Sequence, residues 1–444
     1  MNVIYQFLTF LLVLGIIVLV HELGHYVAAR LMKIRVEVFS FGMGKRLFGK
    51  KVGDTDFRVS LVPVGGFVRM AGEEDFDPEH AAPDQFMAKN RAQKIFTLVM
   101  GPLMNLVLAL LLIVLVNMGG VEMDSYKLEK PLIGYIEKGS PAEKAGLLPG
   151  DVLLAINGRK TPNWKEVEIT IGTNPKEKLK IDFSRDGMRR TTELKVATSS
   201  RYEIGYAGFY WQLPAVIGDI VKNYPAWKAG LKPGDRITAV DGRPVANYFV
   251  LADLIHASPG KPMDLAYQRN GLALSARLTP VLENGVGVIG FTVRIASTKI
   301  RYGLAAAVAN SFQEAGRLTF LTFNAFKKMI QRKISVKSFS GPLEIARVSQ
   351  QALESGFSNF FMLIAFISLQ LGIVNLFPIP GLDGGLLLIF TIEAAIRRDL
   401  NQKFKNILLY AGFAFLIGLM VFIILNDIAK TLPNGWQSLF PFVK

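Results

Sequence analysis

The sequence has no cysteine and only four histidines among its 444 residues. Without cysteine the chain can form neither a disulfide nor a thiolate metal site, so a bound metal would need His, Asp or Glu ligands. The net charge is +15, but no aromatic-and-basic binding motif accompanies it. We therefore expect no nucleic-acid partner, and attraction to membrane lipid with anionic head groups is the simpler explanation of the charge.

Charged side chains are missing from four long stretches of the chain. These are residues 1–20, 95–121, 355–382 and 406–426. Each is long enough for a helix that crosses about 30 Å of hydrocarbon. The predicted membrane spans are residues 4–31, 95–118, 357–392 and 406–427. The first stretch has no Lys or Arg at its start and is longer than the apolar region of a usual signal peptide, so we expect an uncleaved span there.

Lysine and arginine are concentrated in two connections between the predicted spans, residues 32–94 and 393–405. Basic residues near the ends of spans favour the cytoplasmic side. Both connections are therefore expected in the cytoplasm. The N-terminus, the long region 122–354 and the C-terminus are then expected on the other side of the membrane, because large domains cross regardless of their charge.

Within the first predicted span, the uncharged stretch 1–20 is followed directly by His-Glu-Leu-Gly-His at residues 21–25. On a helix, positions four apart share a face, so His21 and His25 can offer two nitrogens to one metal ion. Glu22 can reach a water at that metal without binding the metal, which is the place of a general base. A chance match is the alternative. Ionisable groups at membrane depth cost about 2.5–3.5 kcal/mol each, which favours a shared function.

A catalytic zinc needs a third protein ligand and an open position. The other two histidines, His80 and His256, are far from any predicted span. Asp383 is the better candidate, because it is the one charge in a segment otherwise apolar from 355 to 392. The helix is expected to break just before it, at Pro378, Pro380 and Gly381. Asp383 could also mark the cytoplasmic end of the third span, and the two interpretations are compatible.

The region 122–354 contains an internal repeat. Residues 141–159 and 225–243 share twelve of nineteen positions, including the pattern Ala-Gly-Leu-x-Pro-Gly-Asp. In each copy a proline is expected to begin a short helix and a glycine to end it. Asn157-Gly158 and Asp241-Gly242 predict tight turns between strands. Each copy resembles a bacterial PDZ domain, and the alternative is a generic β-rich pair that binds no ligand.

Residues 56–71 are unusually apolar for a connection between spans. Strand-like residues flank Pro63-Val64-Gly65-Gly66, which predicts a hairpin with its turn there. Such backbone persists at membrane depth only where it is buried in protein or lines a wet cavity. The hairpin would then lie beside the metal site and pair with an unwound substrate. A plain cytosolic hairpin is the alternative.

Three motifs together resemble the site-2 protease family of intramembrane metalloproteases. They are HELGH at 21–25, GPLMN at 101–105 and NLFPIPGLDGG at 375–385, and with the hairpin and the repeats the resemblance covers essentially the whole chain. It implies that one zinc ion is bound by His21, His25 and Asp383, and that Glu22 activates the water. The substrate contacts that it implies are Asn375, Pro378, Pro380, Val64, Gly65, Gly66 and Phe67.

The same resemblance implies a substrate class and a location. The substrates would be single-pass membrane proteins such as an anti-sigma factor, cut within the transmembrane segment after their outer domain has been trimmed. Clearance of leftover signal peptides is the runner-up role. The PDZ pair would exclude untrimmed substrates, and the location would be the bacterial inner membrane with the PDZ domains in the periplasm.

The expected fold is a polytopic α-helical membrane protein with four transmembrane helices, a membrane-associated β-hairpin and two inserted PDZ-like α+β domains. The expected order is a first half of the membrane core at 1–121, PDZ-like domains at 122–210 and 211–297, amphipathic membrane-associated helices at 298–354 and a second half of the core at 355–444. The segment 302–326 would lie on the membrane or against the helix bundle.

Two other functions compete with proteolysis. One is an inactive membrane scaffold that works through its PDZ domains, and the intact set of His21, Glu22, His25 and Asp383 speaks against it. The other is a zinc transporter. Transport would need acidic or histidine side chains along several spans, and the stretches 95–121 and 406–426 carry none.

Overall fold

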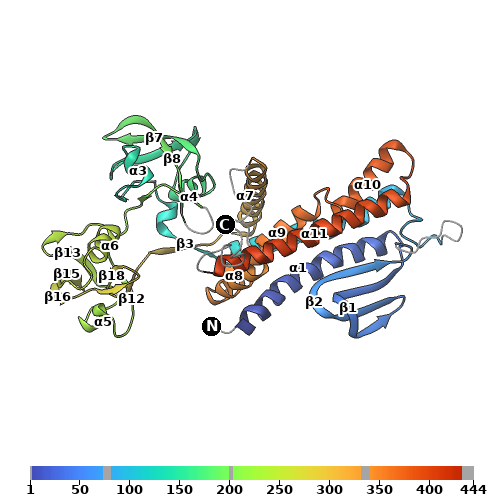
Figure 1. Cartoon of the computed structure of the whole chain (residues 1–444), viewed down its shortest axis with the longest axis horizontal. Coiled ribbons are helices and arrows are strands. Elements are labelled where there is room, and N and C mark those ends of the chain that lie inside the picture. The colour runs from blue at the N-terminus through green and yellow to red at the C-terminus, as the bar shows by residue number, and fades with distance from the viewer. Residues whose placement is uncertain (1–2, 74–81, 200–203, 332–340, 433–444) are drawn as a thin grey trace, which may run out of the picture. The chain divides into compact units, whose positions relative to one another are not determined.

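The computed structural model describes residues 3–73, 82–199, 204–331 and 341–432 (Figure 1). The chain forms two compact units, one of residues 1–121 with 300–444 and the other of residues 122–299. We call them the membrane unit and the repeat unit. His80 lies outside the described residues.

Four helices of the membrane unit are long and apolar enough to cross a membrane. They are α1 (Val3–Leu31), α2 (Arg91–Gly119), α9 (Phe357–Asn375) and α11 (Gln402–Thr431). Asn90 caps the start of α2, since its side chain accepts a hydrogen bond from the backbone N–H of Gln93. The four helices coincide with the four stretches that lack charge.

The break expected within the third predicted span is confirmed, because residues 357–392 form two helices and not one. The helix α9 ends at Asn375, and α10 (Asp383–Ile396) begins after a loop of residues 376–382. Pro378 and Pro380 have no backbone N–H to continue a helical ladder. Gly381 has a φ of +95°, which a side chain would disfavour. The break places Asp383 at the first turn of a new helix.

The helix α2 contacts the other helices of the membrane unit most widely. It packs on α1, α9, α10 and α7 (Leu304–Ile330). Ala109 and Ile113 of α2 are buried with Ala365 and Leu369 of α9. The helix α7 presents small buried residues, Ala307, Ser311 and Ala315, and exposes large aromatic ones on its other side. It therefore lies against the bundle, and α8 (Pro342–Glu354) packs on α1, α9 and α11.

The predicted hairpin at 56–71 is wrong in its pairing. The two strands are β1 (Val36–Val52) and β2 (Thr55–Met70), and their connection lies at residues 53–54. Residues 38–41 pair on one side with 56–59 and on the other with 66–69. The two arms of the expected hairpin are thus separated by an earlier segment of the chain. A turn pattern identifies a change of direction but not the strand that comes to lie between its arms.

The repeat unit contains two copies of one arrangement. The first copy comprises β4 (Tyr135–Ile136), α3 (Pro141–Lys144), β5 (Val152–Ile156), β6 (Arg159–Lys160), α4 (Trp164–Gly172), β7 (Lys178–Arg185), β8 (Met188–Lys195), β9 (Ala197–Ser199), β10 (Ile204–Tyr206) and β11 (Phe209–Tyr210). The second comprises β12 (Ile217–Ile220), α5 (Pro225–Lys228), β13 (Arg236–Val240), β14 (Arg243–Pro244), α6 (Tyr248–His256), β15 (Met263–Arg269), β16 (Leu272–Leu278), β17 (Val281–Glu283), β18 (Val286–Val288) and β19 (Phe291–Val293). The segments β3 (Val121–Asp124) with η2 (Ser125–Leu128), and β20 (Ser297–Ile300), lie at the two ends of the unit.

Each copy has its own four-stranded sheet and its own core. The sheets have the orders β6-β5-β7-β8 and β14-β13-β15-β16. Core positions correspond between the copies, with Val167 and Ile181 of the first matching Leu251 and Leu265 of the second, all fully buried. The predicted tight turns at Asn157-Gly158 and Asp241-Gly242 are confirmed, because all four residues have positive φ.

The aspartate of each Pro-Gly-Asp pattern is buried and bound by an arginine. In the second copy, Nε and Nη2 of Arg269 donate to the two carboxylate oxygens of Asp235, both over 2.7 Å, and Asp235 is 1% exposed. In the first copy, Arg185 binds Asp151 in the same way. Such two-point pairs are the strong form of arginine–carboxylate contact.

We expect Asp235→Ala to destabilise the second copy, because Arg269 and the backbone N–H of Lys232 both lose their acceptor. Burial opposes ionisation of Asp235, but Arg269 and the backbone N–H of Lys232 hold its pKa below the usual value. The stabilisation is thus present at neutral pH and is lost as the pH falls through the lowered pKa. Urea unfolding of the fragment 122–299 measures both effects. The control is Asp264→Ala, which removes a pair of 3.8 Å between exposed side chains and should change stability little.

Candidate metal centre

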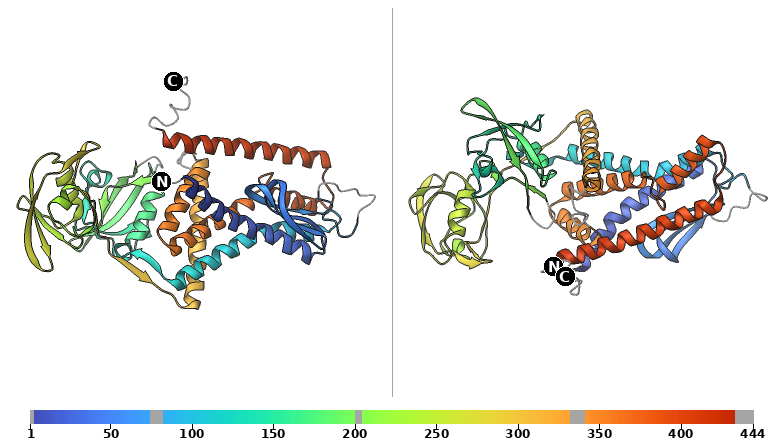
Figure 2. Two further views of the ribbon diagram at one scale, coloured as in Figure 1. Left: turned by 90° about the horizontal axis from the view of Figure 1, so that it is seen from below. Right: turned by 45° about the horizontal axis from the view of Figure 1, so that its top comes forward.

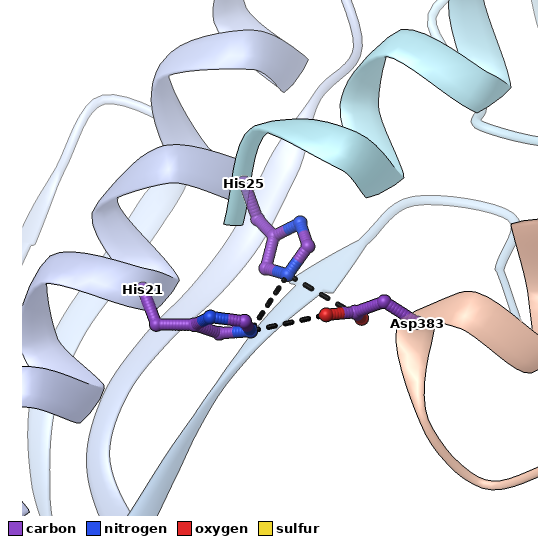
Figure 3. Close-up of side chains that lie close together, drawn as sticks. All are labelled: His21, His25 and Asp383. Carbon is purple, nitrogen blue, oxygen red and sulfur yellow. Dashed lines mark hydrogen bonds and ion pairs between the residues drawn. The ribbon is translucent and has the colours of Figure 1, made fainter. Parts of the chain in front are cut away.

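His21, His25 and Asp383 lie together in the membrane unit (Figure 3). Their ligand atoms are all within 4.8 Å of one another. Nε2 of His21 is 3.1 Å from Oδ2 of Asp383, and Nε2 of His25 is 3.5 Å from Oδ1. The two imidazole Nε2 atoms are 3.3 Å apart. Three potential ligands therefore point at a common centre.

Two different structural devices bring these side chains together. The histidines are one helical turn apart on α1 and share a face. Asp383 reaches them because the loop 376–382 interrupts the helix and places Asp383 at the first turn of α10. Both histidines are 7% exposed, and the Asp383 side chain is 20% exposed. The centre is thus nearly closed on the α1 side and open beside Asp383.

The outer nitrogens of both rings meet polar groups of α2. Nδ1 of His25 lies 2.9 Å from the backbone oxygen of Thr97, so it carries the proton and leaves Nε2 free to bind a metal. Nδ1 of His21 lies 3.2 Å from the side-chain amide of Asn105. Oδ1 of this amide is buried without a partner. If the amide is rotated by 180°, its Oδ1 accepts a hydrogen bond from the Nδ1–H of His21, and both groups then have a partner.

This arrangement fits a zinc ion. Both imidazoles are oriented as neutral ligands through Nε2, and Asp383 adds a carboxylate. Oδ2 of Asp383 is buried without a hydrogen bond, and a bound cation would compensate it. Three nitrogen and oxygen ligands that leave one side open are typical of a catalytic zinc site.

Glu22 lies beside the centre but outside the ligand set. The helix α1 packs on β2 here, with the side chain of Glu22 next to Gly66. A Cβ added to Gly66 would lie 3.1 Å from Cγ of Glu22 and 2.9 Å from the side chain of Val18, so a larger residue there would displace Glu22. The sheet therefore fixes the carboxylate next to the two histidines.

A cavity of about 1270 Å³ opens beside the centre. Of the site residues expected from sequence, it is lined by His21, Glu22, Gly65, Gly66, Asn375 and Asp383. Nδ2 of Asn375 lies 3.4 Å from Nε2 of His21. Among the described side chains, those of Phe67, Pro378 and Pro380 do not line it. The side chain of Val64 lies outside the described part of the structure, and His256 ends α6 in the repeat unit.

Sequence reasoning assigned no role to Thr97 and Asn105, although GPLMN was recognised as a motif. Gly101 of the same motif lies under the ring of His25, where an added Cβ would come within 2.2 Å of Nε2. Asn105 is fully buried. A buried amide in an otherwise apolar span was the signal that could have found it, because such a group needs a polar partner.

We expect Asn105→Leu to weaken zinc binding by about 10–100-fold, since the Nδ1 proton of His21 loses its acceptor. Asn105→Asp keeps an acceptor at the same place and should bind zinc more tightly than the leucine variant. Competition with a chromophoric chelator measures both affinities. Equal affinities for the two variants would contradict the orienting role of Asn105.

Comparison with known proteins places the chain in a family. The model of peptidase family M50 matches residues 9–419. The chain is 32% identical to a protein of Neisseria meningitidis whose name describes a zinc metalloprotease, over 96% of this chain and 100% of that one. It is 30% identical to the regulator of sigma E protease of Salmonella typhi and 29% identical to that of Escherichia coli K12, each over 97% of this chain and 100% of the relative. The chain therefore belongs to peptidase family M50, and it is a zinc metalloprotease of the site-2 type.

Proposed function

We propose that the chain cleaves peptide bonds within the transmembrane segments of single-pass membrane proteins. The observation that supports this most directly is the position of the metal-ligand cluster. His21 and His25 lie on α1, and Asp383 follows α9 after a short loop. Both α1 and α9 are long and apolar enough to cross a membrane. Ionisable side chains at such positions are costly unless they serve binding or chemistry.

The residues of the centre divide the work of hydrolysis. Zinc, held by His21, His25 and Asp383, would polarise the scissile carbonyl and make the attacking water more acidic. Glu22 takes a proton from that water and delivers it to the leaving amine. The amide of Asn375 donates a hydrogen bond to the substrate oxygen as negative charge develops there.

The substrate must be extended at the cut, because the peptide bonds of a helix are shielded by the neighbouring turns. We assign the binding of this extended segment to β2, where Gly65 and Gly66 line the cavity next to Glu22. Val64 and Phe67 flank this stretch in sequence. Pro378 and Pro380 would contact the substrate from the loop on the side of Asp383.

The pathway is proposed from the relatives and from charge. Two of the relatives are named regulators of sigma-E proteases, and the proposed substrate is accordingly a trimmed anti-sigma factor. The basic connections 32–94 and 393–405 would lie in the cytoplasm, and the protein in a bacterial inner membrane. The repeat unit, outside the cytoplasm, would act as a PDZ-type filter that excludes untrimmed substrates.

The proposal is tested with the full chain in liposomes that also contain a single-pass membrane protein. Mass spectrometry of the fragments locates the cut. We expect a cut inside the apolar segment, its loss when 1,10-phenanthroline removes the metal, and its return when zinc is added. A cut confined to soluble flanking residues would refute an intramembrane site, and no cut with any substrate would favour the inactive scaffold.

A further inference from the structure

The helix α11 touches the rest of the membrane unit along its middle at one main place. Figure 2 shows α11, in red, along the outside of this unit. From residue 407 to 425, all of which the structure describes, Gly412 is the single buried residue. Leu409, Tyr410 and Phe413, on either side of it, line the cavity of the metal centre. The contact at Gly412 is therefore next to the catalytic cavity.

Gly412 brings the backbone of α11 directly against the loop 376–382. A Cβ added at Gly412 would lie 2.1 Å from the carbonyl oxygen of Pro380 and 2.4 Å from its carbonyl carbon. Real Cβ atoms essentially never come within 3.0 Å of another heavy atom, so any side chain here must move backbone. The carbonyl of Pro380 cannot rotate away as the end of a flexible side chain would.

The two ends of α11 are fixed by buried polar contacts. At the beginning, Nζ of Lys405 lies 2.5 Å from Glu393 of α10, and both side chains are almost completely buried. At the other end, the carboxylate of Asp427 accepts from the backbone N–H groups of Gly341, Leu343 and Glu344 at the start of α8, over 2.9–3.2 Å. Extra volume at Gly412 therefore presses on the loop more readily than it moves the whole helix.

The loop transmits such a displacement to Asp383. The N–H of Leu382 donates to the oxygen of Ile379 over 3.1 Å, and the N–H of Gly385 donates to that of Leu382 over 3.0 Å. A Cβ at Gly385 would lie 2.5 Å from the oxygen of Ile379, so the first turn of α10 lies tightly on the loop. Pro380 and Asp383 thus belong to one stiff segment.

We propose that Gly412 is a positioning residue for the third metal ligand. The close approach that it permits sets the loop at the place where the carboxylate of Asp383 meets His21 and His25. This inference rests on the proposed role of Asp383 as a ligand. It adds that α11, whose residues line the cavity, also controls the geometry of the metal centre.

The test compares Gly412→Ala with Gly418→Ala in the purified full chain. Gly418 lies on the same helix with nothing within 4 Å of an added Cβ, so both variants gain the same helix propensity and only one gains a clash. The protein is loaded with Co²⁺, whose visible absorption reports ligand geometry. For Gly412→Ala we expect altered absorption bands and about tenfold faster loss of the metal to a chelator, because changes to groups that orient a metal ligand weaken metal binding. Gly418→Ala should match the wild type in both measurements.

Two further variants make each outcome decisive. Leu416→Ala removes the side chain that packs 2.9 Å from the Cβ position of Gly381, adds no volume and should also speed metal loss. It replaces Gly412→Ala if that variant fails to fold. Asp383→Ala is the reference. If it loses the metal while Gly412→Ala and Leu416→Ala behave like Gly418→Ala, the positioning role is refuted and the ligand assignment stands. If Asp383→Ala keeps its metal, the ligand assignment itself fails.

Discussion

Replacing Glu22 by glutamine should abolish proteolysis while leaving the metal bound. Glutamine has nearly the same shape, so the contact of this side chain with Gly66 of β2 is kept. It cannot take up a proton from water at neutral pH. Loss of a general base costs about 10²–10⁴-fold in rate, and the expected cleavage falls below detection in most membrane assays. Cleavage of a single-pass protein in liposomes and elemental analysis of zinc measure the two parts.

Glu73 provides the matched control for this experiment. Its carboxylate lines the same cavity as those of Glu22 and Asp383, and it accepts a hydrogen bond of 3.2 Å from the backbone N–H of Met70. Glu73→Gln removes one negative charge from the cavity, as Glu22→Gln does, but touches no ligand. We expect it to retain most of the activity. Full cleavage by Glu22→Gln, or equal loss in both variants, would rule out Glu22 as the specific base.

Much of the centre could be predicted from sequence, because its signals are local or unusual. The spacing of His21 and His25 follows from helix geometry alone. Asp383 was found because one carboxylate in a long apolar stretch needs a partner. The structure brings these three side chains together from two helices, α1 and α10.

The remaining features depend on contacts between distant segments. Residues 38–41 lie between the two arms of the expected hairpin, and no turn pattern reveals which strand will insert there. The break in the third span, by contrast, was expected from Pro378, Pro380 and Gly381, because proline acts on the local backbone. Asn105 carries no charge, so it did not stand out in an apolar run.

In the repeat unit, too, local features were predicted from the sequence, whereas a contact between distant residues was not. The helix start at Pro225 and the turn at Asp241 follow from local chemistry, and both were predicted. The pair between Asp235 and Arg269 was not, because the two residues lie on different elements of the fold. Local patterns thus indicate where the chain turns, whereas burial decides which polar residues must find partners.

Replacing Asp383 by alanine should remove most of the bound zinc and all activity. Two histidines remain, and a zinc site with two protein ligands lacks the third that catalytic sites use. The carboxylate is also the only negative group in the proposed ligand set, so its loss leaves the cation uncompensated. Elemental analysis after dialysis against a weak chelator measures the metal that remains.

Glu393→Gln is the control for a general effect of losing a buried carboxylate from α10. Glu393 is 1% exposed and lies toward the opposite end of α10 from Asp383. It forms an ion pair with Lys405 of α11. Its neutralisation should lower thermal stability, because it leaves Lys405 buried without a charged partner, yet zinc content should stay at the wild-type level. If Asp383→Ala retains zinc, the third ligand must be another residue. If Glu393→Gln loses as much zinc as Asp383→Ala, the metal depends on the integrity of α10 and not on the Asp383 carboxylate.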